Sequence, residues 1–423
     1  MLTNRVSYFE PTNQSVFKDK VLNWVSRFSP FVFLDSCGYT DPYGRYEWIA
    51  AACSAKAFDS WSDLREQPVN QWLFGHLSYE AHRQMGVFTD VLHPQETTFP
   101  ELHFFIPQTV IFRKRGEVGI HIHSVAQEAT TIRAQIEALP EPEHPRLPKQ
   151  RFSKAFDEGA YCAVVELLRR HIYEGDCYEI NFCNRREAML PELVVPVSVF
   201  KALRDLSPSP FAACYQVGMH WLVSASPERY LTLENDRLVS QPIKGTAPRF
   251  ADARADVASR DTLQHSAKEQ AENVMIVDLT RSDWAKVCRL GSVQVAELFG
   301  IQAFPQVFQL VSTVSGTLLP EKTLWNAIEQ SFPMGSMTGA PRQKVMDLIR
   351  HYEQQERGLF SGTLGFVDPD GHADFNVVIR SVWGDNSGSV AFNTGGAITW
   401  NSTAQAEWEE CILKGNAIES LFR

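Results

Sequence analysis

Apolar residues repeat at the spacing of an α-helix in one segment of the chain. They fall at positions i, i+3, i+4, i+7 and i+11, which places them on a single helical face: Tyr161, Val164, Val165, Leu168 and Ile172. Gly175 then ends the pattern, as glycine commonly does just past a helix. Residues 177–182 continue with alternating polar and apolar positions, which predicts a half-buried strand directly after the helix.

The rest of the chain mixes predicted strands and helices. Alternating or apolar runs between turn residues predict strands at residues 32–34, 44–49, 110–112, 118–123, 221–224, 230–233, 238–243, 362–367, 375–382 and 390–393. The strands at residues 110–112 and 118–123 are expected to form a hairpin. Helical spacing predicts helices at residues 267–278, 324–330, 342–352 and 404–421. Because these elements do not follow one another in regular βαβ units, the pattern favours an α+β fold over a doubly wound sheet.

Proline residues concentrate in residues 138–152, at positions 140, 142, 145 and 148. A segment of this composition is stiff and extended, so it predicts a connector between two parts of the chain. We therefore expect an amino-terminal region over residues 1–137 and a main domain over residues 153–423. A length of 423 residues is sufficient for this arrangement.

Composition and charge narrow the class of protein. Hydrophobic residues make up 44% and charged residues 21%, as in ordinary soluble proteins. The net charge of −10 is spread along the chain without a basic segment, so nucleic acid is not an expected partner. No stretch approaches the ~20 apolar residues of a membrane span, and residues 1–11 lack the apolar core of a secretory signal. Eight cysteines without a C-x-x-C pair predict reduced thiols in a cytoplasmic protein, with neither a zinc site nor a disulfide framework.

Lys244 lies two residues after Pro242 and directly before Gly245, just past an apolar run. Proline fixes φ and glycine permits close backbone approach, so this lysine is expected at a rigid junction of strand and turn. An amine held there can act as a nucleophile if burial or neighbouring cations keep part of it unprotonated. The alternative is a surface lysine on a turn, and this stretch alone does not decide between the two.

Two pairs of glutamates are spaced three residues apart within predicted helices. Glu269 and Glu272 share one helical face, and Glu407 and Glu410 share another. Such a face is usually solvated, although Trp408 interrupts the polar pattern of the second pair. If the two faces met, their oxygens would suit Mg²⁺, which accepts a few carboxylates and keeps its waters for substrate oxygens. Periodicity cannot show that the helices meet.

Glycine-containing turns follow a predicted strand at Gly395-Gly396 and precede a predicted helix at Gly335 and Gly339. Backbone N–H groups at such turns can hold anions, although an ordinary tight turn has the same sequence. Neither stretch matches a P-loop or a dinucleotide-binding motif, so a nucleotide is not an expected ligand.

Eight motifs occur in one order along residues 153–423. They are Gly175-Asp176-Cys177-Tyr178 with Asn181, Ser226-Pro227-Glu228-Arg229, Pro242-Ile243-Lys244-Gly245-Thr246, Ala271-Glu272-Asn273 with residues 275–279, residues 310–313, Thr338-Gly339-Ala340-Pro341, Ile379-Arg380-Ser381, and residues 406–414. With these motifs the chain resembles the chorismate-utilising enzymes and, within them, the first component of the aminodeoxychorismate (para-aminobenzoate) synthases. Residues 34–36 and 44–46 extend the resemblance faintly into the amino-terminal part. The resemblance implies a large sandwich of two antiparallel sheets surrounded by helices, with the amino-terminal part folded onto it.

The resemblance implies a reaction of chorismate with ammonia that gives 4-amino-4-deoxychorismate, for folate synthesis. Lys244 stands where this branch carries a nucleophilic lysine and where anthranilate synthases typically carry alanine. Its amine would add at ring C2 as the C4 hydroxyl leaves, and ammonia would then enter at C4 and expel the lysine. Glu228 matches the glutamate that helps the hydroxyl to leave.

The same resemblance implies a Mg²⁺ site and a substrate site. Glu272 and Glu410 match direct metal ligands, and Glu407 and Glu269 match supporting positions. The residues expected around the substrate are Arg380, Lys414, Thr338, Gly395, Gly396, Thr246, Phe360 and Gln309.

Four residues depart from the family pattern. Gln309 stands where histidine is usual, and because glutamine cannot carry a proton, assistance to the leaving group would fall more heavily on Glu228. Ala397 replaces a glycine, Arg342 replaces a lysine, and Glu179 replaces a common glutamine.

The resemblance also implies partners. Ammonia would come from a separate glutaminase subunit, because none of the cysteines lies in the tight turn of an amidotransferase nucleophile and no length remains for a second domain. Residues 34–36 resemble a segment that lines a tryptophan pocket in relatives. Two alternatives stay open: an anthranilate synthase component I, against which Lys244 argues, and a non-catalytic chorismate-binding regulatory protein, to which Gln309 points.

Overall fold

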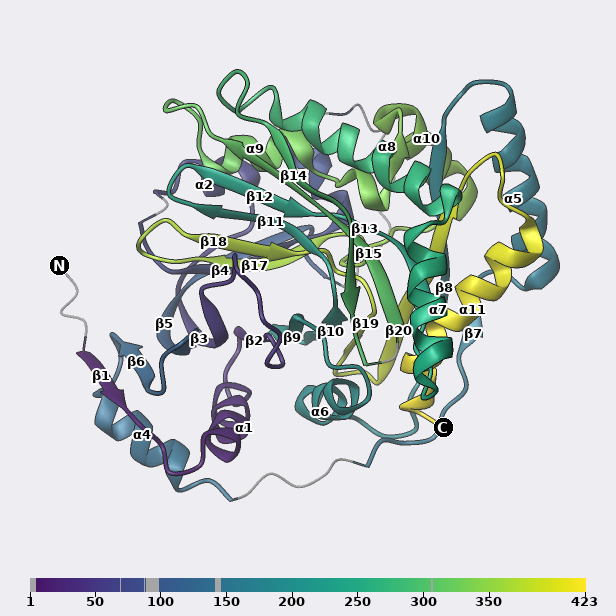
Figure 1. Ribbon diagram of the computed structural model, residues 1–423. Coiled ribbons are helices and arrows are strands. Elements are labelled where there is room, and N and C mark those ends of the chain that lie inside the picture. The colour runs from purple at the N-terminus through teal and green to yellow at the C-terminus, as the bar shows by residue number, and fades with distance from the viewer. Residues whose placement is uncertain (1–4, 69, 87, 89–98, 141–145, 306) are drawn as a thin grey trace.

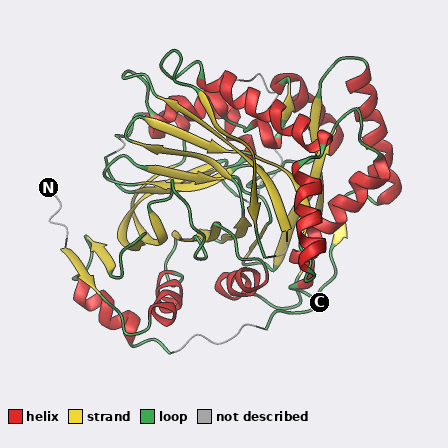
Figure 2. Cartoon of the chain, viewed as in Figure 1, coloured by secondary structure: helices red, strands yellow, loops and turns green. Residues whose placement is uncertain are grey.

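The computed structural model describes residues 5–68, 70–86, 88, 99–140, 146–305 and 307–423. Strands fill the middle of the molecule and helices cover its outer faces (Figure 1). Figure 2 shows the same separation by type of secondary structure. The strands pair antiparallel, as at β8 and β20, which confirms the predicted α+β class. None of the described helices has the length and apolar character needed to cross a membrane.

The strands form one continuous ribbon of antiparallel pairs. It begins with β7 (Ser153–Lys154), β8 (Glu179–Met189), β20 (Ser389–Ile398), β19 (Ser381–Asp385), β10 (His220–Ser226), β9 (Phe211–Val217) and β2 (Phe31–Asp35). It continues through β3 (Tyr46–Phe58), β5 (Leu102–Lys114), β4 (Leu73–Leu77), β17 (Thr363–Val367), β18 (Ala373–Asn376), β11 (Arg229–Glu234), β12 (Arg237–Gln241) and β15 (Val307–Thr317).

At the far end, β13 (Ile243–Pro248) and β14 (Gln294–Ala303) both pair with β15. Three strands attach at other points: β6 (Ile120–Ser124) to β5, β1 (Arg5–Phe9) to β6, and β16 (Gly339–Ala340) to β8. Strands β8 and β13 therefore lie near opposite ends of the ribbon.

The helices lie in groups around the strands (Figure 1). At the bottom of the view are α1 (Gln14–Val25), α4 (Ala129–Glu137) and α6 (Pro196–Leu206). At the top are α8 (Ala267–Trp284), α9 (Leu324–Ser331) and α10 (Arg342–Glu353), and on the right are α5 (Glu158–Tyr173), α7 (Ala253–Gln264) and α11 (Ala404–Ser420). The short helices are α2 (Trp61–Arg65), α3 (His82–Met85), η1 (Tyr79–Ala81) and η2 (Gly335–Met337).

The helix and strand predicted around Gly175 are present as α5 and β8. The Asp157 side chain accepts a hydrogen bond from the Ala160 N–H and caps the first turn, and Gly175 ends the helix with φ of 85°. Its predicted apolar face packs against β8, α10 and α11 in a cluster that includes Tyr161 and Val165. This second core fixes the start of β8 against its neighbours.

Two predicted strands are wrong in their extent. Residues 375–382 form the end of β18 and the start of β19, because Arg380 between them has φ of 50° and turns the chain. Residues 238–243 divide into β12 and β13 at Pro242, which has no N–H for the ladder. Both interruptions lie at residues of the expected site.

Strands from both predicted parts of the chain share the ribbon. β2 pairs with β9, and β4 pairs with β17, so the amino-terminal strands are hydrogen-bonded to the main domain. Residues 141–145, at the centre of the predicted connector, lie outside the described residues. The domain boundary at residues 138–152 stays a prediction.

Candidate active site

Lys244 lies on β13 opposite Leu310 of β15, with only 8% of its surface exposed. Its Nζ donates a hydrogen bond to Glu179 Oε1 at 2.6 Å. Glu179 is the first residue of β8 and is fully buried. The alternative of a surface lysine on a turn is therefore excluded.

Lys244 is held as an ammonium ion in the free protein. Burial by itself would lower the pKa of its amine, but the carboxylates of Glu179, Glu272 and Glu228 outweigh burial and raise the pKa. The condition named for a nucleophilic amine, that burial or neighbouring cations keep part of it unprotonated, is not met in the free protein, since the charged groups around it are anions. An amine in this state needs a proton acceptor before it can attack a substrate.

Glu228 lies between β10 and β11 and is buried. Its N–H donates to Ser226 Oγ at 3.2 Å, and its carbonyl oxygen accepts from the Val377 N–H at 3.0 Å, so its backbone is fixed on both sides. Burial raises the pKa of the Glu228 carboxyl to about 7. A carboxyl with this pKa can donate a proton at neutral pH. It borders a cavity of about 350 Å³ whose walls include Pro242 and Ser336.

The structure brings the two glutamate pairs together. Glu269 and Glu407 lie in the first turns of α8 and α11, where the partial positive charge of the helix end favours a carboxylate. Glu272 and Glu410 follow on the same faces. Lys268 Nζ lies 3.8 Å from Glu272 Oε1 and 3.5 Å from Glu407 Oε1, and so bridges the two helices.

Two glycines allow the strands to approach these carboxylates. A Cβ on Gly396 would lie 3.1 Å from Glu407 Oε2 and 3.6 Å from Glu410 Oε1. A Cβ on Gly245, where φ is +84°, would lie 2.8 Å from Glu269 Oε2. The four carboxylates therefore face β13 and β20, beside the buried lysine.

The electrostatics of the glutamates suit a bound cation. Burial raises the pKa of Glu272 to about 8, and it also raises the pKa of Glu269 and Glu407. Lys414, which pairs with Glu410 at 2.6 Å, lowers the pKa of that carboxyl. Glu272 Oε1 accepts no hydrogen bond from any described residue. Crowded carboxylates with an unpartnered oxygen are donors that a hard cation such as Mg²⁺ accepts.

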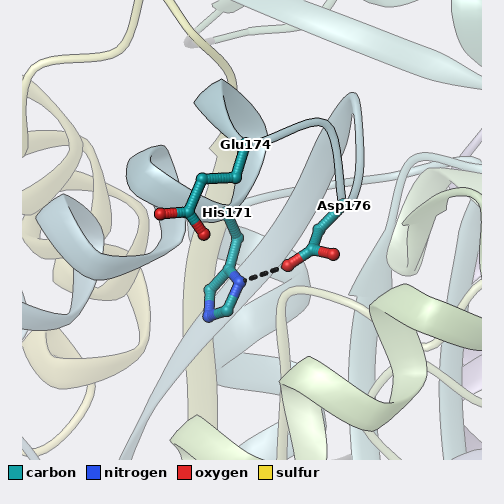
Figure 3. A group of neighbouring side chains, drawn as sticks. All are labelled: His171, Glu174 and Asp176. Atoms are coloured by element: carbon teal, nitrogen blue, oxygen red, sulfur yellow. Dashed lines mark hydrogen bonds and ion pairs between the residues drawn. The ribbon is translucent and has the colours of Figure 1, made fainter.

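A tighter group of potential ligands lies at the turn between α5 and β8 (Figure 3). His171, Glu174 and Asp176 each place one ligand atom within 4.8 Å of the others, a spacing that the four glutamates do not reach among the described residues. However, His171 Nδ1 bonds to Asp176 Oδ2 at 2.6 Å and Nε2 bonds to the Tyr352 hydroxyl at 2.9 Å. With both ring nitrogens engaged, the group ties α5 to α10.

Arg380 is half-buried at the turn between β18 and β19. Burial lowers its pKa to about 10. Within the described parts of the chain its side chain makes no hydrogen bond or ion pair, while its carbonyl oxygen accepts from the Ala225 N–H at 3.1 Å. A guanidinium without an anion is suited to receive the carboxylate of a ligand.

Three further predicted residues have defined contacts. Lys414 Nζ donates to the Gly395 carbonyl oxygen at 3.0 Å. A Cβ on Gly395 would lie 2.1 Å from the Phe182 carbonyl oxygen, so only glycine allows this approach of β20 to β8. Thr338 is fully buried, and its Oγ1 donates to the Met334 carbonyl oxygen at 3.1 Å.

The remaining predicted residues differ in their surroundings. Gln309 is buried opposite Thr246, and its Oε1 has no hydrogen-bond partner among the described residues. Thr246 itself is exposed. Phe360 packs in the large hydrophobic core, and its place in the substrate site stays a prediction.

Sequence reasoning missed two residues as members of the site. Glu179 was noted only for departing from a family pattern, and its contact with a residue 65 positions away has no local signal. Lys268 precedes Glu272 by four positions on one helical face, and this spacing could have suggested their pairing.

A pocket is present at residues 34–36, as expected, and residues of β2 and β3 contribute to its walls. It contains about 480 Å³ of empty space, part of which is open to solvent, and the residues that line it include Asp35, Asp41, Trp48, Arg115 and Asp374. It shares no lining residue with the cavity beside Glu228.

Comparisons with known proteins agree with this geometry. The chain is 38% identical over 264 residues to an aminodeoxychorismate synthase of Streptomyces pristinaespiralis, a match that covers 62% of this chain and only 36% of that protein. It is 28% identical to aminodeoxychorismate synthase component 1 of Bacillus subtilis over 86% of this chain and 81% of that one. The solved structure of anthranilate synthase component I from Streptococcus pneumoniae has the same fold, with a TM-score of 0.77, 24% identity and coverage of 91% and 93%. The family model described as chorismate binding enzyme matches residues 33–420, and the chain therefore belongs to this family.

Proposed function

We propose that this chain is an aminodeoxychorismate synthase component that converts chorismate and ammonia to 4-amino-4-deoxychorismate and water. The observation that carries the proposal is the buried amine of Lys244, which lies within the electrostatic reach of the acidic Glu228. An anthranilate synthase has no evident use for a lysine at this position. The relatives named aminodeoxychorismate synthase support the same branch of the family.

In the proposed reaction, the Lys244 amine adds to ring C2 of chorismate while the bond from C4 to its hydroxyl breaks. The carboxyl of Glu228 supplies the proton with which that hydroxyl leaves as water. Ammonia then forms a bond at C4, and the bond from C2 to Lys244 breaks. A pKa of about 7 leaves a large part of Glu228 protonated at neutral pH, as this role requires.

The carboxylates of chorismate need cationic or N–H partners. The unpaired guanidinium of Arg380 is our candidate for one of them. Lys414 and the backbone at Gly395 and Gly396 are candidates for the other end of the substrate, because they lie beside the glutamates. These contacts would orient the ring over Lys244.

We also propose that Glu269, Glu272, Glu407 and Glu410 hold one Mg²⁺. The raised pKa values of Glu269, Glu272 and Glu407, and the Glu272 Oε1 that accepts no hydrogen bond from a described residue, support a cation at this place. When bound, Mg²⁺ would orient a substrate carboxylate and offset developing negative charge. Lys268 is the group that would have to move, because its ammonium lies between Glu272 and Glu407.

The source of ammonia is proposed to be a separate glutaminase subunit. All eight cysteines are free thiols, and burial raises the pKa of Cys177, two residues before Glu179, to about 11. A glutaminase needs a reactive thiolate, which these surroundings disfavour. Activity with ammonium salts at raised pH, and with glutamine only after a glutaminase is added, would support this division. Glutamine-dependent turnover by the pure chain would contradict it.

The pocket at residues 34–36 is a proposed site for tryptophan. Its walls include Trp48, which suits an aromatic ring, and the carboxylates of Asp35 and Asp41, which already pair with Lys18 and Arg229. Tryptophan should then inhibit the enzyme, raise its thermal midpoint or remain bound during purification. If it does none of these, the pocket has another role.

Product analysis tests the main proposal and both alternatives. The purified chain is incubated with chorismate, Mg²⁺ and ammonium salt, and the products are separated by chromatography. We expect 4-amino-4-deoxychorismate as the product. In the cell, we propose that the enzyme makes this precursor of para-aminobenzoate, and thus of folate, in the cytoplasm. Anthranilate would identify the other synthase, and binding of chorismate without turnover would identify a regulatory protein.

A further inference from the structure

Glu179 is the only described residue that accepts a hydrogen bond from the Lys244 amine. The contact joins Lys244 Nζ to Glu179 Oε1 at 2.6 Å, which is short for a hydrogen bond between nitrogen and oxygen. Both side chains are buried, so bulk water does not compete strongly for either. A proton can pass directly between these two atoms.

The contact is built into the backbone on both sides. Glu179 lies opposite Ala340 of β16. The Tyr178 N–H donates to the Ala340 carbonyl oxygen and the Asn181 N–H donates to the Thr338 carbonyl oxygen, both at 2.8 Å. A Cβ on Gly339 would lie 2.1 Å from the Glu179 carbonyl oxygen, so this close pairing requires glycine. Lys244 is fixed in turn by its pairing with β15.

The second oxygen of Glu179 is unusual for a buried carboxylate. Glu179 Oε2 has no hydrogen-bond partner in the part of the chain that the structure describes. A purely structural ion pair is expected to satisfy both oxygens, because an unpartnered buried oxygen costs about 1–3 kcal/mol. The carboxylate therefore has an open hydrogen-bonding position beside the oxygen that Lys244 contacts.

Other groups around Lys244 are less suited to accept this proton. Glu228 and Glu272 act on the amine electrostatically, but neither accepts a hydrogen bond from its Nζ among the described residues. Gln309, on the strand paired with β13, has a side chain that cannot take up a proton. Lys268 faces Glu272 and Glu407 and carries a proton itself.

We propose that Glu179 is the base that removes a proton from the Lys244 ammonium and so generates the nucleophilic amine. This inference rests on the proposed function and adds a catalytic residue to it. The Nζ–H bond of Lys244 breaks, and an O–H bond forms on Glu179. The neutral amine then uses its electron pair to form the bond to ring C2.

The protons balance over the full cycle. Glu228 gives its proton to the departing hydroxyl, which leaves as water, and the adduct nitrogen carries a positive charge. When ammonia attacks C4, Lys244 leaves as a neutral amine and the new C4 group is an ammonium. That ammonium returns a proton to Glu228, and Glu179 returns its proton to Lys244. The net change is chorismate plus ammonia to aminodeoxychorismate plus water.

The test compares Glu179→Gln with the wild type in single-turnover experiments without ammonia. Intact-protein mass spectrometry of quenched samples gives the rate constant for the covalent adduct on Lys244. Glutamine keeps the size of the side chain and an oxygen for the hydrogen bond, but it cannot accept the proton. We expect adduct formation to slow by about 100-fold or more, as is typical for the loss of a general base. Glu187→Gln is the matched control, since Glu187 lies on the same strand but is exposed, and its rate should not change.

A second variant separates proton transfer from positioning. In Glu179→Ala, added formate should raise the rate of adduct formation at least several-fold, because a small carboxylate can replace the missing base, and formate should not affect the wild type. A Glu179→Gln rate within threefold of the wild type would overturn the proposal, and so would a folded Glu179→Ala that formate does not rescue. If Glu179→Gln does not fold, as judged by circular dichroism, the formate experiment decides. Absence of any adduct in the wild type would instead refute the proposed function of Lys244.

Discussion

Two buried cations at the centre of this molecule, Arg229 and Lys244, are held in opposite ways. Arg229 donates to both oxygens of Asp374 at 2.9 Å, and it also donates to Asp41 and Gln241. Lys244 has one acceptor, Glu179, and that carboxylate keeps an unpartnered oxygen. A buried polar group whose partners are complete makes the fold rigid, whereas incomplete pairing is a property of reactive sites.

The same contrast between a reactive group and a fully paired structural group holds for two consecutive residues, Glu228 and Arg229. Burial raises the pKa of the Glu228 carboxyl to about 7, and its side chain borders a cavity. Arg229 lines the same cavity, but its guanidinium is held in a network that joins β11 to β18 and to Asp41 of the amino-terminal part. Substitutions around Lys244 and Glu228 should therefore affect the chemistry, whereas substitutions around Arg229 should affect stability.

The largest effect is expected for Lys244→Ala. This variant should form no covalent adduct when chorismate is supplied without ammonia, and its turnover should fall below detection, because no other amine lies at this place. Intact-protein mass spectrometry measures the adduct. Lys149→Ala, at an exposed position, serves as the control and should react like the wild type. An identical adduct in Lys244→Ala would remove Lys244 from the reaction.

Removal of one carboxylate from the glutamate set is expected to have the next largest effect. Glu272→Ala or Glu410→Ala should abolish Mg²⁺-dependent turnover and leave the circular dichroism spectrum unchanged, since a small cation with few protein ligands cannot lose one without loss of affinity. Glu409→Ala is the matched control, because Glu409 lies on the same helix and is exposed. Near-normal activity of Glu410→Ala at limiting Mg²⁺ would mean that these helical faces do not bind the metal.

Asp374→Ala should act on stability. It leaves the buried Arg229 with Asp41 as its remaining anionic partner, so we expect the free energy of unfolding to fall by about 3 kcal/mol. Urea titration measures the change. Asp370→Ala, which removes an exposed partner of Arg45, should cost no more than about 1 kcal/mol. If Asp374→Ala were as stable as the wild type but formed no adduct, the division between the two cations would be incorrect.

The smallest effect, measured as the change in stability per pH unit, concerns pH. The pKa of Glu272 is about 8 in the folded protein, against an ordinary value of 4.5, so between these values the folded state binds more protons than the unfolded state. Without Mg²⁺ the free energy of unfolding should therefore fall as pH rises from 5 to 8, by at most about 1.4 kcal/mol per pH unit from this group. Glu272→Gln should make that slope shallower in urea titrations at several pH values. Equal slopes in both proteins would show that Glu272 titrates normally.

The sequence predicted local elements better than the contacts between them. The helix that ends at Gly175 and the strand after it follow from periodicity and an end signal, and both are present as α5 and β8. Strand β14 was missed because most of its residues are partly or fully exposed, so it has no apolar alternation. The break at Arg380 was missed because an arginine with positive φ has no sequence signature.

The sequence predicted the candidate site mainly through the order of its motifs along the chain. The spacing of the glutamates suggested a ligand set, but only the fold shows that α8 and α11 meet through Lys268. The sign of the electrostatic effect on Lys244 was also beyond sequence reasoning, because it depends on Glu179, which the pairing of β8 and β16 brings into place.

The positions of β8 and β13 in the strand ribbon have a consequence for how the enzyme assembles. These strands lie near opposite ends of a long series of antiparallel pairs, and the hydrogen bond between Lys244 and Glu179 joins them. The two residues are 65 positions apart along the chain, and such non-local contacts are entropically costly to form early in folding. The reactive lysine should therefore acquire its partner late, when most of the sheet is already in place. A partly folded chain would then carry an ordinary, unreactive lysine, and a ligand bound across both strands would stabilise the whole protein by mass action.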